Sequence, residues 1–169
     1  EAYSAYLLGS RCEHSCILTA EAAGLPETLC SYHKIFTGAA EKGLLPRPRC
    51  IVYTNLTCDA NMLTFKRMER FFNVPAFFID VPWTQTEADV RAVASQLRDL
   101  GRFLEDITGN KISEKRLMSR IRRSIDTMDT FRQARRLQKD KYIPTDLVSP
   151  QYGAMVNNVL LGTPEVEKF

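Results

Sequence analysis

Two stretches decide the fold: Cys50-Ile51-Val52-Tyr53-Thr54-Asn55 and Ala76-Phe77-Phe78-Ile79-Asp80-Val81. Each is a short apolar run rich in β-branched and aromatic residues, which is typical of a buried strand. Between them a helix is expected from about Cys58 to Phe72, with Thr57 as its N-cap. Strand, helix and strand cover about 32 residues, the size of a right-handed βαβ unit in a parallel sheet.

Helices are expected on both sides of this unit. A helical pattern runs from Tyr3 to Ala22, and a second helix is predicted over residues 27–41, with Pro26 at its start. Beyond the second strand, Thr84 and Glu87 form a capping-box pattern in front of a long amphipathic helix. The order of these elements predicts an α/β fold, a Rossmann-like parallel sheet with flanking helices, followed by a helical segment.

The helical segment begins after the long amphipathic helix. Gly109 is predicted to end that helix, and Ser113 is predicted to cap a further one. Four apolar residues of this further helix recur at helical spacing and are expected to face inward: Leu117, Ile121, Ile125 and Met128. The chain is therefore divided into an α/β domain over residues 1–109 and a helical segment over residues 110–169.

Composition and motifs exclude several classes of protein. The chain has 169 residues, of which 44% are hydrophobic and 25% charged, as in an ordinary globular domain. No apolar run approaches the roughly 18–20 residues that span a bilayer, and the first residues do not form a signal peptide, so a cytoplasmic location is expected. Neither strand is followed by a glycine-rich dinucleotide- or phosphate-binding loop. The two histidines, His14 and His33, have no evident Ser or Asp relay.

Cys58 is the most informative of the five cysteines. It follows a predicted strand and lies at the start of a helix, where peptide N–H groups and the helix dipole stabilise a thiolate, the form that binds iron. In an open α/β sheet, ligands bind at this place, outside the carboxyl ends of the strands. The alternative is a small buried cysteine that fills the turn between strand and helix.

The other cysteines carry weaker signals. Cys30 lies in the first turns of the second helix, where the same electrostatic argument competes with a buried structural role. Cys12 and Cys16 share one helix face, but Thr19 replaces the third cysteine of a radical-enzyme cluster motif, so both are interpreted as structural. Cys50 opens a strand and is assigned to the core.

Five local motifs occur in order along the chain. They are Pro26-Glu27-Thr28-Leu29-Cys30-Ser31-Tyr32 with Lys34 and Gly38, Pro46-Arg47-Pro48, Tyr53-Thr54-Asn55 with Cys58-Asp59, Phe78-Ile79-Asp80-Val81-Pro82, and Thr108-Gly109 followed by Ile112-Ser113 and Leu117. This series closely resembles the 2-hydroxyacyl-CoA dehydratase family, which includes the benzoyl-CoA reductase subunits. The resemblance is strong from Gly24 to Leu117 and looser over the remainder.

The resemblance implies α/β domains with a [4Fe–4S] cluster that is held by three cysteines per subunit. Cys30 and Cys58 match the first two ligand positions, and the third belongs to a C-terminal domain of the family. The candidates for the surroundings of the cluster or the substrate are Ser31, Asn55 and Asp59. Because no cysteine follows Cys58, we expect a piece of a longer protein, inactive by itself. Residues 1–109 then form an N-terminally incomplete cluster-binding domain, and residues 110–169 lead towards a missing C-terminal domain.

The function that the resemblance implies is elimination of water from a 2-hydroxyacyl-CoA to give an enoyl-CoA. In the family, one electron enters the thioester and forms a ketyl radical anion, which expels the hydroxyl group and acidifies the β-proton. An ATP-dependent iron–sulfur activator protein supplies the electron. The implied partners are therefore this activator, a second homologous subunit in a heterodimer, and the acyl-CoA substrate. No catalytic base is identified among the residues.

Two alternatives stay open. The first is a reductase of the same family, of the benzoyl-CoA type or with a double cluster. The second is a non-catalytic α/β module that binds a partner through the basic residues 111–141, which include eleven Lys or Arg against four acidic residues. These basic residues are interpreted as the solvated outer face of a helix. The alternative is that they dock an acidic partner or the phosphates of CoA. Its low aromatic content argues against nucleic acid, and no membrane partner is expected.

Overall fold

The computed structural model describes residues 11–56, 58–139, 142 and 160–165. The chain divides into two compact units, which meet in the sequence between Lys111 and Ile112. In the part of the chain that is described, the fold is mixed α/β, with a two-stranded parallel sheet and five α-helices. None of the helices in these ranges combines the length and the apolar character needed to cross a membrane.

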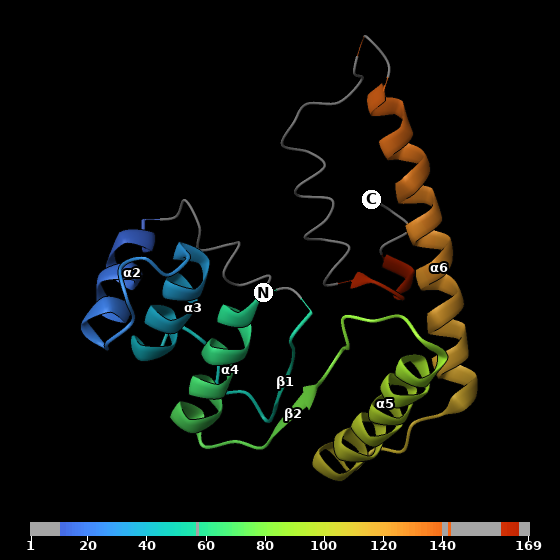
Figure 1. Cartoon of the computed structure of the whole chain (residues 1–169), viewed down its shortest axis with the longest axis horizontal. Helices are drawn as coiled ribbons and strands as arrows, with labels where there is room; N and C mark the ends of the chain where they lie inside the picture. Colours follow the sequence, from blue (N-terminus) through green and yellow to red (C-terminus); the bar gives the residue numbers. More distant parts are fainter. Residues whose placement is uncertain (1–10, 57, 140–141, 143–159, 166–169) are drawn as a thin grey trace. The chain divides into compact units, whose positions relative to one another are not determined.

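The predicted βαβ unit is present in the first unit (Figure 1). Its elements and the following helix are β1 (Ile51–Thr54), α4 (Asp59–Phe72), β2 (Ala76–Ile79) and α5 (Glu87–Thr108). The strands are parallel, with Ile51 opposite Ala76 and Thr54 opposite Ile79. Cys58 has extended backbone and is the N-cap of α4, so the prediction of Thr57 as the cap is wrong by one residue. A sheet of two strands does not establish a Rossmann-like fold, which stays a prediction.

Aromatic side chains pack on both faces of the strand pair, because neighbouring residues of a strand point to opposite faces. Tyr53 of β1 stacks on Phe65 of α4, with ring centroids 6.3 Å apart, and lies 5.1 Å from Phe78 of β2. Phe77 faces the other side, where its ring lies 5.4 Å from that of Phe103 in α5. The strands therefore lie between α4 and α5 (Figure 1).

The prediction that both strands are buried is wrong for several of their residues. Val52 in β1 is 40% exposed and Phe78 in β2 is 38% exposed, whereas Ile51 and Tyr53 belong to the buried core. A continuous apolar run is typical of a strand that other elements cover on both faces. Within the described ranges, the helices around this two-stranded sheet cover the strands only in part.

Two helices precede the strands, α2 (Glu13–Ala22) and α3 (Ser31–Glu41). They pack closely, and Cys16 of α2 is fully buried in a cluster with Ile35 and Ala39 of α3. Gly38 permits this approach, because a Cβ atom at this position would lie 1.8 Å from the carbonyl oxygen of Cys16. The backbone of α2 therefore leaves no room for a side chain at residue 38.

Helix α3 begins later than predicted. Pro26 opens a turn instead of a helix, since its carbonyl accepts a hydrogen bond from the Leu29 N–H at 3.0 Å. Cys30 then adopts a non-helical backbone conformation, with φ −49° and ψ 129°, and Ser31 is the first helical residue. Cys30 is therefore an N-cap and not a residue of the first turns. Residues 1–10, on which the start of the preceding predicted helix falls, lie outside the described ranges.

Helix α5 has a capping box, but not the predicted one. The Thr86 hydroxyl accepts from the Asp89 N–H at 3.2 Å, and the Asp89 carboxylate accepts from the Thr86 N–H at 2.9 Å. Side-chain hydrogen bonds from Thr86 and from Thr84 hold the pKa of the Asp89 carboxyl below its usual value. The prediction of Thr84 with Glu87 is wrong by two residues, whereas the predicted end at Gly109 is confirmed.

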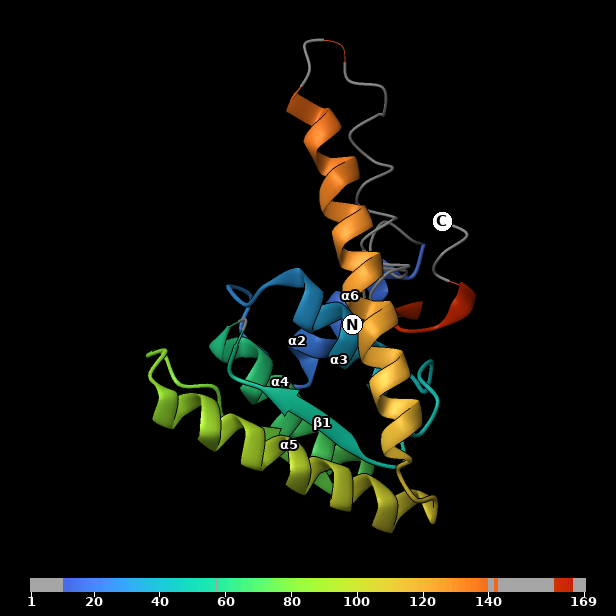
Figure 2. The same ribbon diagram turned by 90° about the vertical axis from the view of Figure 1, so that its right-hand side faces the viewer.

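The second unit contains α6 (Glu114–Arg136), which continues as a 3₁₀ turn over Leu137–Lys139 (Figure 2). Ser113 caps α6 as predicted, since its hydroxyl accepts from the Arg116 N–H at 3.4 Å. The apolar residues predicted to face inward are exposed: Leu117, Ile121, Ile125 and Met128. Helical spacing produces an apolar stripe, but a stripe becomes a core only where another element covers it.

Candidate functional site

Asn55 holds the carboxyl ends of β1 and β2 together. Its amide nitrogen donates to an Asp80 carboxylate oxygen at 2.6 Å and to the Val81 carbonyl at 3.2 Å, and its amide oxygen accepts from the Val81 N–H at 2.8 Å. Gln96 of α5 accepts from the Asp80 N–H and donates to the Asp80 carbonyl, both at 2.8 Å. Asn55 thus uses its side chain to fix the edge of the sheet at which ligands bind in open α/β sheets.

Replacing Asn55 with alanine is expected to lower the free energy of unfolding by about 1–3 kcal/mol, because three partly exposed hydrogen bonds are lost. Urea denaturation followed by circular dichroism measures this change. Asn110→Ala is the matched control. Because Asn110 lies in the exposed connection after α5, its replacement is expected to change stability by less than about 0.5 kcal/mol. Equal effects of the two replacements would contradict the bridging role of Asn55.

Both candidate ligands, Cys30 and Cys58, are N-cap residues. Cys30 precedes α3 and Cys58 precedes α4; both are exposed, and neither side chain accepts a capping hydrogen bond. Their backbone carbonyls do take part, since the His33 N–H donates to that of Cys30 at 3.0 Å and the Asn61 N–H to that of Cys58 at 3.1 Å. Each thiol therefore lies at the start of a helix, where backbone N–H groups without a helical partner point outward.

His33 brings the starts of these two helices together. It lies in the first turn of α3, is only 7% exposed, and its Nε2 atom lies 3.5 Å from the Cys58 Sγ. On the other side of the ring, Nδ1 lies 3.1 Å from the Thr64 hydroxyl oxygen of α4. Because Cys30 caps the helix that carries His33, the contact places the start of α3 beside Cys58. The sequence did not indicate this contact, since no local pattern pairs residues 33 and 58.

Ser31 and Asp59 are the first helical residues of α3 and α4. Both are exposed, and each directly follows one of the two candidate cysteines. The Asp59 carboxylate lies in the first turn of α4, where the helix dipole stabilises a negative charge. A contribution of either residue to the surroundings of a cluster or substrate stays a prediction.

A part-buried ion pair fixes the turn that leads into α3. Lys34 is buried, and its Nζ donates to the Glu21 carboxylate of α2 and to the Glu27 carbonyl of the turn, both at 2.8 Å. A buried ammonium group is tolerated only where a charge partner and hydrogen bonds satisfy it. Lys34 therefore ties α2, the turn and α3 to one another directly behind the Cys30 cap.

The remaining three cysteines lie elsewhere. Cys16 is fully buried between α2 and α3, which confirms its structural role. Burial, reinforced by the neighbouring Cys12, raises the pKa of the Cys16 thiol, and a raised pKa disfavours the thiolate that binds metals. Cys12 is exposed at the start of α2, and Cys50 is half-buried in front of β1.

The donor chemistry of Cys30 and Cys58 fits an iron–sulfur cluster, because thiolates are the usual ligands of such clusters. Within the ranges that the structure describes, however, no group of three or more His, Cys, Asp or Glu side chains is arranged to hold a metal ion. The two cysteines therefore fit two of the three positions that the family resemblance implies. A complete site requires a further ligand.

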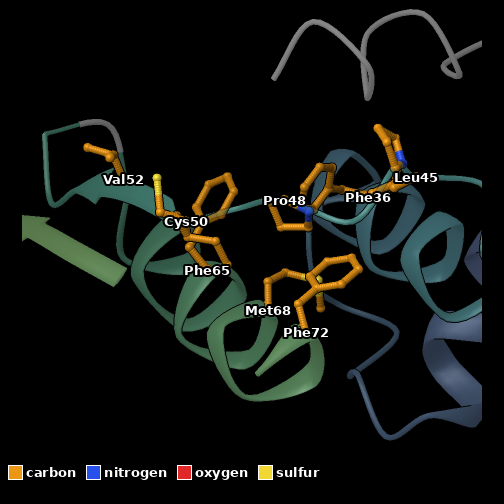
Figure 3. Close-up of a pocket in the computed structure, with 10 residues that line it drawn as sticks. Phe36, Leu45, Pro48, Cys50, Val52, Phe65, Met68 and Phe72 are labelled. Carbon is orange, nitrogen blue, oxygen red and sulfur yellow. The ribbon is translucent and has the colours of Figure 1, made fainter. Parts of the chain in front are cut away.

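An apolar pocket that the sequence did not indicate lies among α3, α4 and the segment before β1 (Figure 3). Its volume is about 290 Å³. It is lined by Phe36, Leu45, Pro46, Pro48, Cys50, Ile51, Val52, Phe65, Met68 and Phe72. Several of these residues pack against the buried core around Met68, and neither Cys30 nor Cys58 lines the pocket. We therefore assign the pocket to packing and not to the candidate site.

Comparisons with known proteins indicate one family. The family model described as 2-hydroxyglutaryl-CoA dehydratase, D-component, matches residues 2–169. The (R)-phenyllactyl-CoA dehydratase alpha subunit of Clostridium sporogenes is 25% identical over 114 residues, which are 62% of this chain and 27% of that protein. The (R)-2-hydroxyglutaryl-CoA dehydratase subunit alpha of Acidaminococcus fermentans is 32% identical over 74 residues, which are 41% of this chain and 16% of that protein. The aligned part of the chain thus spans about a quarter or less of these relatives.

Proposed function

Because the chain belongs to the 2-hydroxyglutaryl-CoA dehydratase D-component family, as its motifs predicted, we propose that it is part of an alpha-type subunit of a 2-hydroxyacyl-CoA dehydratase. The whole enzyme eliminates water from a 2-hydroxyacyl-CoA to give an enoyl-CoA. The two relatives named above are dehydratase subunits, which favours this reaction over that of a reductase. The chain spans a small part of those relatives, so the reaction is proposed for the whole enzyme. The proposal also includes its partners: the second homologous subunit, the ATP-dependent activator and the acyl-CoA.

The domain organisation belongs to the same proposal. Residues 1–109 form the α/β domain that carries the first two cluster ligands, Cys30 and Cys58. Residues 110–169 form a helical segment that leads towards a C-terminal domain, from which the third cysteine comes. Dehydration therefore requires the longer protein.

The contact between Cys58 and His33, 3.5 Å long, is the observation that best supports the site. It draws the start of α3, capped by Cys30, to the start of α4, capped by Cys58. Two thiols on neighbouring helix starts offer ligands whose positions are set by regular structure and not by a loop. The Asn55 bridge holds the end of β1 in place just before Cys58.

A [4Fe–4S] cluster bound at this site supplies the one-electron chemistry that amino-acid side chains lack. Cys30 and Cys58 would hold it through their sulfur atoms. Both thiols are exposed at helix starts, where a cluster can reach them.

Anaerobic purification of the full-length subunit with its partner tests the proposal. We expect brown protein with roughly four iron atoms per subunit, which dehydrates a 2-hydroxyacyl-CoA once the activator and ATP are added. Iron-free, colourless protein would overturn the proposal and favour the non-catalytic partner-binding module. Iron-containing protein that reduces an aromatic acyl-CoA without dehydrating a hydroxyacyl-CoA would favour the reductase.

A further inference from the structure

We propose that His33 is a positioning residue, which donates a hydrogen bond from Nε2 to the Cys58 thiolate and thereby tunes the bound cluster. The inference rests on the proposed function, because it takes Cys58 as a cluster ligand. Its geometric basis is the imidazole ring between two elements, with Nε2 3.5 Å from the Cys58 Sγ and Nδ1 3.1 Å from the Thr64 hydroxyl oxygen. Neither contact was expected from the sequence.

For a neutral imidazole beside a ligand thiolate, the chemistry of the three groups leaves one consistent assignment of protons. A ligand thiolate has no proton and accepts hydrogen bonds, so Nε2 must carry the proton that lies between His33 and Cys58. A neutral imidazole then has an unprotonated Nδ1, which accepts a hydrogen bond. The Thr64 hydroxyl is able to donate to it. Thr64 therefore selects the tautomer in which His33 donates to Cys58.

Burial stabilises the two contacts of the imidazole ring. His33 is 7% exposed and Thr64 is 5% exposed, so water competes little for their hydrogen bonds. The Tyr32 ring packs edge-on against the imidazole, with centroids 5.9 Å apart. Contacts from α3 and α4 thus hold the ring with its Nε2 atom 3.5 Å from the sulfur.

A hydrogen bond to a ligand sulfur stabilises the reduced form of a cluster, because reduction adds negative charge to the iron–sulfur unit. The donor also orients the ligand, and loss of such a hydrogen-bond partner of a ligand typically weakens metal binding by about 10- to 100-fold. His33 is therefore expected to raise the reduction potential of the cluster and to slow the loss of iron.

The experiment compares four forms of the full-length subunit, purified anaerobically with its partner: wild type, His33→Leu, His33→Gln and Thr64→Val. Leucine fills a similar space without a donor, whereas the amide nitrogen of glutamine is placed to replace Nε2. The readouts are the reduction potential from a dye-mediated redox titration and the rate of iron loss to a chelator. Far-UV circular dichroism checks that each variant is folded.

We expect His33→Leu to shift the potential to a more negative value and to speed iron loss about 10-fold or more. His33→Gln should restore most of both properties, and Thr64→Val should change them in the same direction as His33→Leu but by less. An unchanged potential in a folded, iron-loaded His33→Leu protein would overturn the inference while the proposed function stands. A wild-type subunit without iron would overturn both.

Discussion

Cys58→Ala in the full-length subunit, purified anaerobically with its partner, is expected to lose at least about nine-tenths of its iron and all dehydration of a 2-hydroxyacyl-CoA. Loss of a group that only hydrogen-bonds to a metal ligand lowers metal affinity by about 10- to 100-fold, so loss of a ligand sulfur lowers it at least as much. The thiol of Cys58 is exposed at the start of α4, and alanine therefore removes the ligand without a large loss of buried contacts. Cys30→Ala is expected to have the same effect, for the same reason.

Cys12→Ala is the matched control. Cys12 is likewise an exposed N-cap cysteine, at the start of α2, but it is not one of the two proposed ligands. Its replacement should leave the iron content and the colour unchanged. Iron is measured by a ferrozine assay and the cluster by its absorbance in the visible range. Full iron content in both Cys30→Ala and Cys58→Ala would show that the ligand assignment is wrong.

Gly38→Ala is expected to lower the free energy of unfolding by about 3 kcal/mol or more, at the upper end of the usual cost of overpacking. The added Cβ would lie 1.8 Å from the carbonyl oxygen of Cys16. No side-chain rotation relieves a clash between a Cβ and a backbone atom, so α2 and α3 must move apart. Their separation also disturbs the core of Cys16, Ile35 and Ala39. Urea denaturation of the chain measures the loss.

Gly43→Ala separates this effect from the general cost of replacing glycine. Gly43 has a positive φ of 68°, but a Cβ there meets no atom within 4 Å. Its replacement should therefore cost only the strain of the left-handed conformation, about 1–2 kcal/mol. If Gly38→Ala were no more harmful than Gly43→Ala, the close packing of α2 on α3 would be wrong.

The candidate site was predictable from the sequence only in part. Cys58 was recognised because a strand followed by a helix is a local pattern, and the structure places it at that junction as the N-cap of α4. The start of α3 was misplaced, because Pro26 is as suited to the turn that it forms with Leu29 as to the first position of a helix. The structure thereby moves Cys30 to the N-cap.

The sequence by itself determined the order of the elements, the βαβ unit and the family, because apolar spacing, caps and the ordered motifs are local properties of the chain. Only the tertiary structure decided that His33 contacts Cys58 and that Gly38 contacts the Cys16 backbone. It also decided which apolar residues are buried, leaving Val52 and the stripe of α6 exposed. The physical reason is that burial and contacts between distant residues depend on which element covers which, and no local periodicity encodes that.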